Sequence, residues 1–172
     1  VFRADARVDE RFELYAVPSD GGAARVRPNP LLMSDRDVQD FAITSDSARV
    51  VFLSNARLFE QFELYSVPID GHLPAIELDP ELLGTKHVLR FELSPDGARV
   101  VFVANTGGQR LYSVPCDGGA TPLELNGQLV PGGNVSEREG AFRISPDSRR
   151  VVYLADQDTD EQFEVYSVPA AG

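Results

Sequence analysis

Three aspartates near the end of the chain have the spacing of a calcium-binding loop. Asp156, Asp158 and Asp160 alternate along the sequence, and Glu161 follows directly. Alternating carboxylates of this kind supply the oxygen ligands of EF-hand loops. The rest of that motif is absent, because no glycine stands at the sixth position and Ser167 replaces the bidentate glutamate. The sequence therefore predicts either a solubilising acidic loop or a weak calcium site at these aspartates, and no other cofactor.

Residue types used in catalysis occur without the patterns that activate them. The two histidines, His72 and His87, are too few for a histidine-rich zinc site. No Gly-x-Ser-x-Gly sequence supplies a nucleophile elbow. Cys116 is the single cysteine, so no disulfide can form within the chain. We therefore predict that the chain contains no catalytic constellation and is not an enzyme by itself.

Composition argues against several classes of partner. The 172 residues carry a formal net charge of −11, which disfavours binding to nucleic acid and to anionic membrane surfaces. No stretch approaches the roughly 20 apolar residues of a membrane helix, and the first residues lack the features of a signal peptide. Hydrophobic residues make up 42% of the chain, which is enough for a packed core. We expect a folded protein that neither binds nucleic acid nor inserts into a membrane.

The elements that must position these residues repeat along the chain. A strand centred on a tyrosine occurs four times, and the intervals are 50, 47 and 54 residues between Tyr15, Tyr65, Tyr112 and Tyr166. A turn of the Ser-Pro-Asp-Gly type precedes a β-branched strand at residues 44–47, 94–97 and 145–148. A Pro-x-Asp-Gly turn follows the first three tyrosine strands. One full unit therefore contains four strands, named a to d in chain order, and no segment shows sustained helical periodicity.

Four-stranded antiparallel units of about 50 residues in tandem are typical of a β-propeller. We predict an all-β propeller of about 3.5 blades, a single domain over residues 1–172 with units near 1–30, 37–80, 87–127 and 139–169. A β-sandwich is the alternative, but the regular period disfavours it. The chain enters within strand b and leaves after strand c. We expect a piece of a longer propeller, or else two chains that complete a ring as a homodimer by pairing at exposed edges.

The segments SPDGARVVFVAN and LYSVPCDGG of the third unit resemble the WD-repeat-like propeller repeat of TolB-type proteins. Similar blades occur in the propeller lobes of tricorn protease and of prolyl oligopeptidase-type peptidases. The resemblance covers essentially the whole chain. It implies a propeller fold, a bias toward protein or peptide binding, and an extracytoplasmic bacterial location. It carries over no catalytic residues, because this repeat serves many functions.

The variable loops predict which face of the propeller binds a ligand. In this topology the a–b and c–d turns share one face, while the b–c and d–a loops share the other. The turns are alike between units, whereas the d–a connections at 28–39, 79–87 and 126–140 differ. Binding residues usually lie on such loops above a rigid scaffold. We therefore place any ligand on the b–c and d–a face.

Strand a is the innermost strand of a propeller blade, so residues entering it line the channel mouth. Alignment on Phe41, Phe91 and Phe142 places Asp37, His87 and Arg138 at one level. Asp40, Arg90 and Ala141 form the next level, with Glu139 nearby. We predict that the six charged or titratable residues hold the carboxylate or amine of a ligand. The alternative is a rim of solvated charges and internal salt bridges.

Repetition also suggests a structural role for the glutamates that open the tyrosine strands. Glu13, Glu63 and Glu164 occupy one position of the unit, and we expect them to pair with the arginine that begins strand b. The function predicted from all these features is a non-enzymatic scaffold for a protein or peptide. One alternative is the propeller lobe of a larger serine peptidase or hydrolase that gates access to a catalytic domain elsewhere. Another alternative is a structural repeat array that associates with itself.

Overall fold

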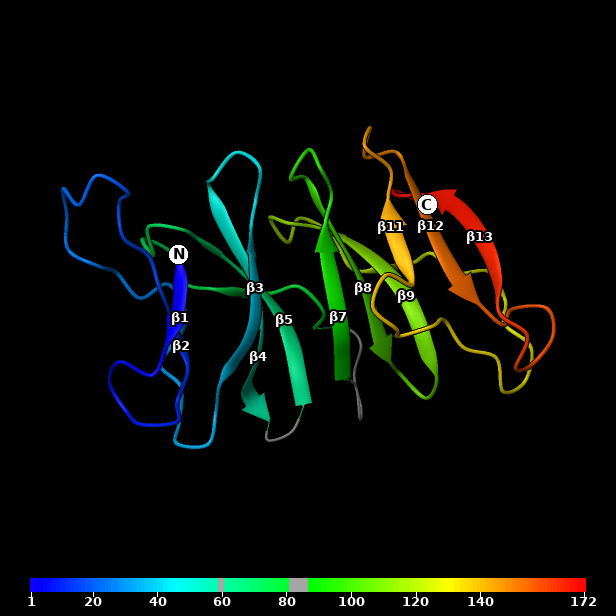
Figure 1. Cartoon of the computed structure of the whole chain (residues 1–172), viewed down its shortest axis with the longest axis horizontal. Coiled ribbons are helices and arrows are strands. Elements are labelled where there is room, and N and C mark those ends of the chain that lie inside the picture. Colours follow the sequence, from blue (N-terminus) through cyan, green and yellow to red (C-terminus); the bar gives the residue numbers. More distant parts are fainter. Residues whose placement is uncertain (59–60, 81–86) are drawn as a thin grey trace.

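The computed structural model describes residues 1–58, 61–80 and 87–172, and within these ranges the chain forms strands and turns but no helix. The strands make four antiparallel sheets, which we call blades 1 to 4 in chain order. The blades stand side by side in a row, and the two termini lie at opposite ends of that row (Figure 1). This architecture confirms the predicted all-β fold built from propeller blades.

The blades differ in how many strands they contain. Blade 1 consists of β1 (Phe2–Ala4) and β2 (Glu13–Tyr15). Blade 2 consists of β3 (Val38–Ile43), β4 (Arg49–Leu58), β5 (Gln61–Pro68) and β6 (Ile76–Glu77). Blade 3 consists of β7 (His87–Leu93), β8 (Arg99–Asn105), β9 (Gln109–Pro115) and β10 (Leu123–Glu124). Blade 4 consists of β11 (Phe142–Ile144), β12 (Arg150–Ala155) and β13 (Glu164–Pro169), and each strand pairs with its neighbour in the chain.

The a–b turns are fixed by one hydroxyl and one carboxylate. In blade 3 the Ser94 hydroxyl donates to Asp96 at 2.5 Å and accepts the N–H of Arg99 at 2.9 Å. The Asp96 carboxylate also accepts the N–H of Ala98 at 3.0 Å. The same set of bonds recurs in the turns that begin at Thr44 and Ser145. The repeated turn sequence therefore specifies the hairpin between strands a and b.

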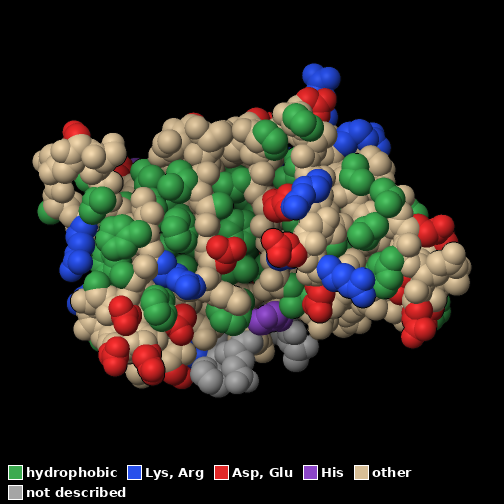
Figure 2. Space-filling model, viewed as in Figure 1, with side chains coloured by type: hydrophobic (Ala, Val, Ile, Leu, Met, Phe, Trp, Pro, Cys, Tyr) green, Lys and Arg blue, Asp and Glu red, His purple; other side chains and the backbone are tan. Residues whose placement is uncertain are grey.

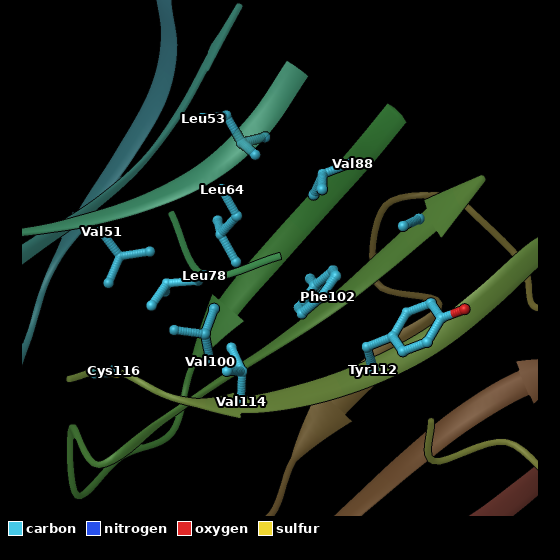
Figure 3. Packing of buried hydrophobic residues seen from close by; sticks show 11 residues of the cluster. Val51, Leu53, Leu64, Leu78, Val88, Val100, Phe102, Tyr112, Val114 and Cys116 are labelled. Atoms are coloured by element: carbon cyan, nitrogen blue, oxygen red, sulfur yellow. The ribbon is translucent and has the colours of Figure 1, made fainter. Parts of the chain in front are cut away.

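Neighbouring blades pack through alternating residues of their second strands. In β8, Val100 and Phe102 belong to the core shared with blade 2, whereas Val101 and Val103 belong to the core shared with blade 4. All four side chains are fully buried. Figure 3 shows the first of these cores, in which Val51 of β4 faces residues of β8 and β9. Because period-two alternation supplies both faces, each inner blade is stable only between two neighbours.

Strand d of the first unit is reduced to a single bridge, which corrects the predicted third strand of blade 1. Ala16 and Val26 exchange backbone hydrogen bonds of 3.0 and 2.9 Å, but the pairing goes no further. In blades 2 and 3 the pairing of strands c and d continues with one more bond, which the N–H groups of Leu78 and Leu125 donate. Pro28 occupies that position in blade 1 and has no N–H to donate.

The predicted partner of the repeated glutamates was wrong. Glu13 forms an ion pair with Arg27 at 2.8 Å, and Glu63 forms one with Arg57 at 3.2 Å. The arginine that begins strand b instead donates to a serine of strand c, as Arg99 does to Ser113 at 2.8 Å. Strands b and c are antiparallel, so the start of one lies beside the end of the other. The position of a residue within the repeat does not show which residue of the neighbouring strand lies beside it, because that depends on the register of the two strands.

Candidate functional site

The candidate site lies along the first strands of blades 2, 3 and 4, which face the viewer in Figure 1 as β3, β7 and β11. Polar bonds join blades 3 and 4 on this face. The Arg143 side chain of β11 contacts Glu92 of β7, and the Arg90 guanidinium donates to the backbone carbonyl of Arg138. Acidic and basic side chains are interspersed on this face rather than gathered by sign (Figure 2). A surface of this kind suits a ligand that carries both charges, such as a peptide.

Asp37 and His87 occupy equivalent positions, as the alignment predicted, and both have a structural contact. The Asp37 carboxylate accepts the N–H of Phe12 at 2.8 Å. The Nδ1 atom of His87 accepts the N–H of Phe62 at 3.3 Å. Each side chain therefore satisfies a backbone donor at the start of strand c in the preceding blade. A ligand that takes the Oδ1 atom of Asp37 or the Nδ1 atom of His87 must compete with that bond.

Arg138 does not belong to this level, which corrects the predicted alignment of blade 4. The equivalent residue is Asn134, whose side-chain oxygen accepts the N–H of Gln109 at 2.9 Å. The next residue, Val135, donates its N–H to the Gln109 carbonyl at 3.0 Å, as Val38 does to Phe12 in blade 2. Residues 136–141 then leave the strand before it resumes at Phe142. The corresponding interruption in β3 and β7 is a single-residue bulge.

The excursion at 136–141 displaces two predicted site residues from strand a. Arg138 and Glu139 are both exposed, and the segment is closed by a 3.0 Å bond from the Ala141 N–H to the Arg138 carbonyl. Asp40 is exposed on β3, where its carboxylate accepts the N–H of Phe41. Arg90 reaches the base of the excursion through the Arg138 carbonyl. Arg90, Arg138 and Glu139 are thus brought together, whereas Asp37 and Asp40 lie on another blade. Ligand binding by the six residues stays a prediction, and part of the 79–87 connection lies outside the described residues.

Two of the three aspartates of the possible calcium site have separate hydrogen-bond partners. Asp156 is buried, and its carboxylate accepts the N–H groups of Asn134 and Glu161, the latter at 3.0 Å. Asp158 accepts the hydroxyl of Tyr166 at 3.0 Å. Among the described residues, no three acidic, histidine or cysteine side chains are grouped so as to hold a metal ion. The weak calcium site stays a prediction.

The chain also forms an apolar pocket that sequence reasoning missed. The pocket has a volume of about 360 Å³ and lies between the c–d turns of blades 1 and 2. Its lining includes Ala16, Val26, Ile69 and Asp70. The unit position of Val26 carries Ile76 in blade 2, and that of Ala16 carries Ser66. Comparing these positions between units could have indicated the pocket, because blade 1 has the smaller side chain, Val26, where blade 2 has Ile76.

In the equivalent place between blades 2 and 3, Cys116 is packed in a core and does not line a pocket. Its thiol is buried in the shared core with Leu78 and Val114. Burial raises the pKa of the thiol to about 12. The thiolate is therefore scarce near neutral pH, and the residue acts as a core side chain.

Within the described ranges, no helix is long and apolar enough to cross a bilayer.

Comparison with known proteins supports the fold and leaves the family open. No family model matches the chain, and no curated protein matches it in sequence. Among solved structures, puromycin hydrolase aligns over 94% of this chain and 26% of its own, with 21% identity and a TM-score of 0.58. A puromycin hydrolase mutant complexed with PGG gives the same coverage and identity with a TM-score of 0.57. A structure from a study of two prolyl endopeptidases aligns over 76% of this chain and 27% of its own, at 18% identity and a TM-score of 0.36.

These similarities bear on the fold only. The chain spans about a quarter of the puromycin hydrolase chain that it matches. The TolB-type resemblance of the repeat stays a prediction, because no family model reports it.

Proposed function

We propose that this chain forms part of the propeller lobe of a larger peptidase-type hydrolase and that it limits access to a catalytic domain of the same protein that lies outside these 172 residues. The observation that carries the proposal is the alignment of 94% of the chain with only 26% of puromycin hydrolase, at a TM-score of 0.58. A segment of this size that consists of propeller blades corresponds to a lobe rather than to a complete enzyme. This reading takes the place of the self-contained scaffold that the sequence favoured.

The chemistry of the inner strands supports a role in guiding a peptide. A peptide has a cationic amino end and an anionic carboxyl end, and β3, β7 and the 136–141 excursion carry both signs of charge. Asp40 is an exposed carboxylate, and Arg138 is an exposed guanidinium. Exposed groups of this kind interact weakly and depend on salt, which suits a passage more than a tight binding site.

A second candidate is a protein or peptide scaffold that works without a catalytic domain. The excursion at 136–141 favours it, because this segment departs from the repeat on the innermost strand and is held there by bonds to Leu154 at 2.8 and 2.9 Å. A departure from the repeat in a rigid setting is the expected form of a recognition loop. The same loop also fits the lobe hypothesis, so only the context of the chain separates the two candidates.

The deciding experiment reads the coding sequence on both sides of the chain and labels its full product with a fluorophosphonate serine-hydrolase probe. The lobe hypothesis expects a Gly-x-Ser-x-Gly sequence in the same reading frame, and labelling at that serine. A matched product limited to residues 1–172 should remain unlabelled. A full product with no such sequence and no labelling would refute the lobe and favour the scaffold.

A further inference from the structure

The excursion at 136–141 projects from the innermost strand of blade 4 as a closed loop. In β3 and β7 a single bulged residue interrupts the pairing with strand b at the same place. In blade 4 the N–H of Ser136 donates to the carbonyl of Leu154 at 2.9 Å, and the N–H of Leu154 donates to the carbonyl of Ala141 at 2.8 Å. Both ends of the excursion therefore meet on one residue of β12, and the residues between them leave the sheet.

Blade 3 fixes the position of this loop. The Gln109 side chain donates to the Glu137 carboxylate at 2.8 Å, and the Arg90 guanidinium donates to the carbonyl of Arg138. Gly140 completes the turn with a φ of 76°, which glycine adopts without steric cost. Blade 3 is itself packed between blades 2 and 4. The anchors of the excursion thus lie inside the row of blades, at the boundary between blades 3 and 4.

This arrangement leaves the side chain of Arg138 available to a ligand. The carbonyl of Arg138 anchors the loop, so its guanidinium is not needed for that purpose. The side chain is exposed, and within the described ranges it makes no hydrogen bond or ion pair. A guanidinium presents parallel N–H donors that match the two oxygens of a carboxylate.

Two further guanidiniums lie against the excursion. Arg90 contacts it through the Arg138 carbonyl. Arg143 lies beside Gly140, where a Cβ atom would come within 3.3 Å of the Nη2 atom of Arg143. The Glu92 carboxylate is already in contact with Arg143. Guanidinium groups are therefore gathered at this boundary, although the chain as a whole has a net charge of −11.

The neighbouring boundary on the same face has the opposite character. At the unit positions of Arg90 and Arg143, blade 2 carries Asp40 and Ala42. The strands β3, β7 and β11 all face the viewer in Figure 1, so a ligand on this face meets both boundaries. A carboxylate is repelled by Asp40 and attracted to the arginines between blades 3 and 4.

We propose that Arg138 binds the carboxylate of a peptide at the boundary between blades 3 and 4, and that Arg90 positions the loop that presents it. The guanidinium is exposed, so the bond is weak and is screened by salt. This inference rests on the proposed function in one respect, that a peptide reaches the inner strands. It names the preferred ligands as peptides that carry a carboxylate.

The test titrates three acetylated tripeptides into the 172-residue protein and follows amide chemical shifts by NMR. Ac-AAA-OH has a terminal carboxylate, Ac-AEA-NH2 has a side-chain carboxylate, and Ac-AAA-NH2 has neither. We expect shifts centred on residues 137–140, and binding of at least one carboxylate peptide that is about threefold or more tighter than that of the neutral peptide. This preference should shrink as sodium chloride is raised from about 0.05 to about 0.3 M. Comparison of the two carboxylate peptides identifies the source of the group, a chain end or an acidic side chain.

Variants of exposed residues assign the effect to one side chain. Arg138→Gln should weaken binding of the preferred carboxylate peptide about threefold or more. Arg149→Gln is the matched control, because Arg149 is also exposed on blade 4 and its side chain makes no hydrogen bond or ion pair within the described ranges. Glu139→Gln removes the carboxylate that follows Arg138 in the chain, and it should bind the peptide at least as tightly as the natural protein.

Several results would overturn the proposal. They are equal binding of all three peptides, shifts that map outside the excursion, and an unchanged affinity in Arg138→Gln. A loss of affinity in Arg149→Gln as large as that in Arg138→Gln would also overturn it, because the effect would then come from net charge alone. The hydrolase-lobe hypothesis is decided separately by fluorophosphonate labelling of the full product, so a failed titration leaves that hypothesis standing.

Discussion

At the scale of single residues, the aspartates of the a–b turns make stability depend on pH. Hydrogen bonds from Thr44, Ser94 and Ser145 are the first cause that lowers the pKa values of Asp46, Asp96 and Asp147, respectively. A carboxyl whose pKa is lowered by folding stabilises the fold above its unfolded pKa, which is about 3.9 for aspartate. That contribution is lost as the pH falls through the lower, folded pKa.

We therefore expect the free energy of unfolding to decrease as the pH is lowered below about 4. The measurement is urea unfolding between neutral and acidic pH for the natural chain and for a chain with Asp→Asn at positions 46, 96 and 147. The triple variant should be less stable at neutral pH and should lose less stability on acidification. Parallel pH profiles for the two chains would show that these turns do not carry the acid dependence.

A second residue-scale prediction concerns backbone strain in the same turns. Ser47 has a left-handed backbone conformation with a φ of 59°. The equivalent residue in blade 3 is Gly97, whose φ is 72°. Ser47→Gly should raise the free energy of unfolding by about 0.5–1 kcal/mol, because glycine adopts this conformation without steric cost. Ser148→Gly is the matched comparison and should gain less, since the Ser148 hydroxyl accepts the N–H of Asp96 at 3.0 Å. Denaturant unfolding measures both variants, and a loss of stability in Ser47→Gly would contradict the argument.

At the scale of elements, the side-chain cap at the end of strand d is testable by exchange between units. In blade 3 the amide oxygen of Asn126 accepts the N–H of Leu111 at 2.7 Å. Asn126→Ala should lower the free energy of unfolding by about 1–3 kcal/mol, because the buried N–H of Leu111 loses its acceptor. Asn126→Asp should be tolerated better, since Asp79 already plays this role in blade 2 at 3.1 Å. The comparison by chemical denaturation isolates the acceptor oxygen from the side-chain volume. Equal losses in the two variants would assign the effect to the amide group instead.

The elements also show which parts of the fold the sequence predicts. The Ser-x-Asp turns and the tyrosine strands specify local geometry through short-range hydrogen bonds and period-two alternation, so their repetition predicted the blades. The alignment failed at Arg138, because an excursion of a few residues leaves Phe142 in register but moves everything before it. Local composition gives no sign of where such an excursion begins. The two bonds between Gln109 and residues 134 and 135 reveal it: the Gln109 N–H donates to Asn134 at 2.9 Å, and the Val135 N–H donates to the Gln109 carbonyl at 3.0 Å.

Candidate site residues were harder to predict than strands for a related reason. Asp37 and His87 are polar residues at the end of a variable connection, which is also the description of a binding residue. Their side chains instead accept backbone N–H groups of the preceding blade, from Phe12 at 2.8 Å and from Phe62 at 3.3 Å. This contact joins residues 25 positions apart, so no local pattern contains it. The apolar pocket near Ile69 likewise depends on packing between two blades.

At the scale of the whole molecule, the row of blades has two different kinds of surface. Inner faces are shared, while the outer face of blade 4 exposes positions that the repeat buries elsewhere. Val101 of blade 3 and Val152 of blade 4 occupy the same unit position, yet they are 0% and 41% exposed. A valine at this unit position is therefore part of a buried core in blade 3 but is partly exposed in blade 4.

This difference gives a prediction that depends on the arrangement of blades alone. Val101→Ala should lower the free energy of unfolding by about 1–3 kcal/mol, because it removes buried methyl groups from the core shared with blade 4. Val152→Ala changes the same residue type at the same unit position and should cost less than about 0.5 kcal/mol. Urea unfolding of the 172-residue chain measures both values. Should the two losses be equal, the outer face of blade 4 must be covered in solution, and sedimentation of the natural chain would then have to show an associated species.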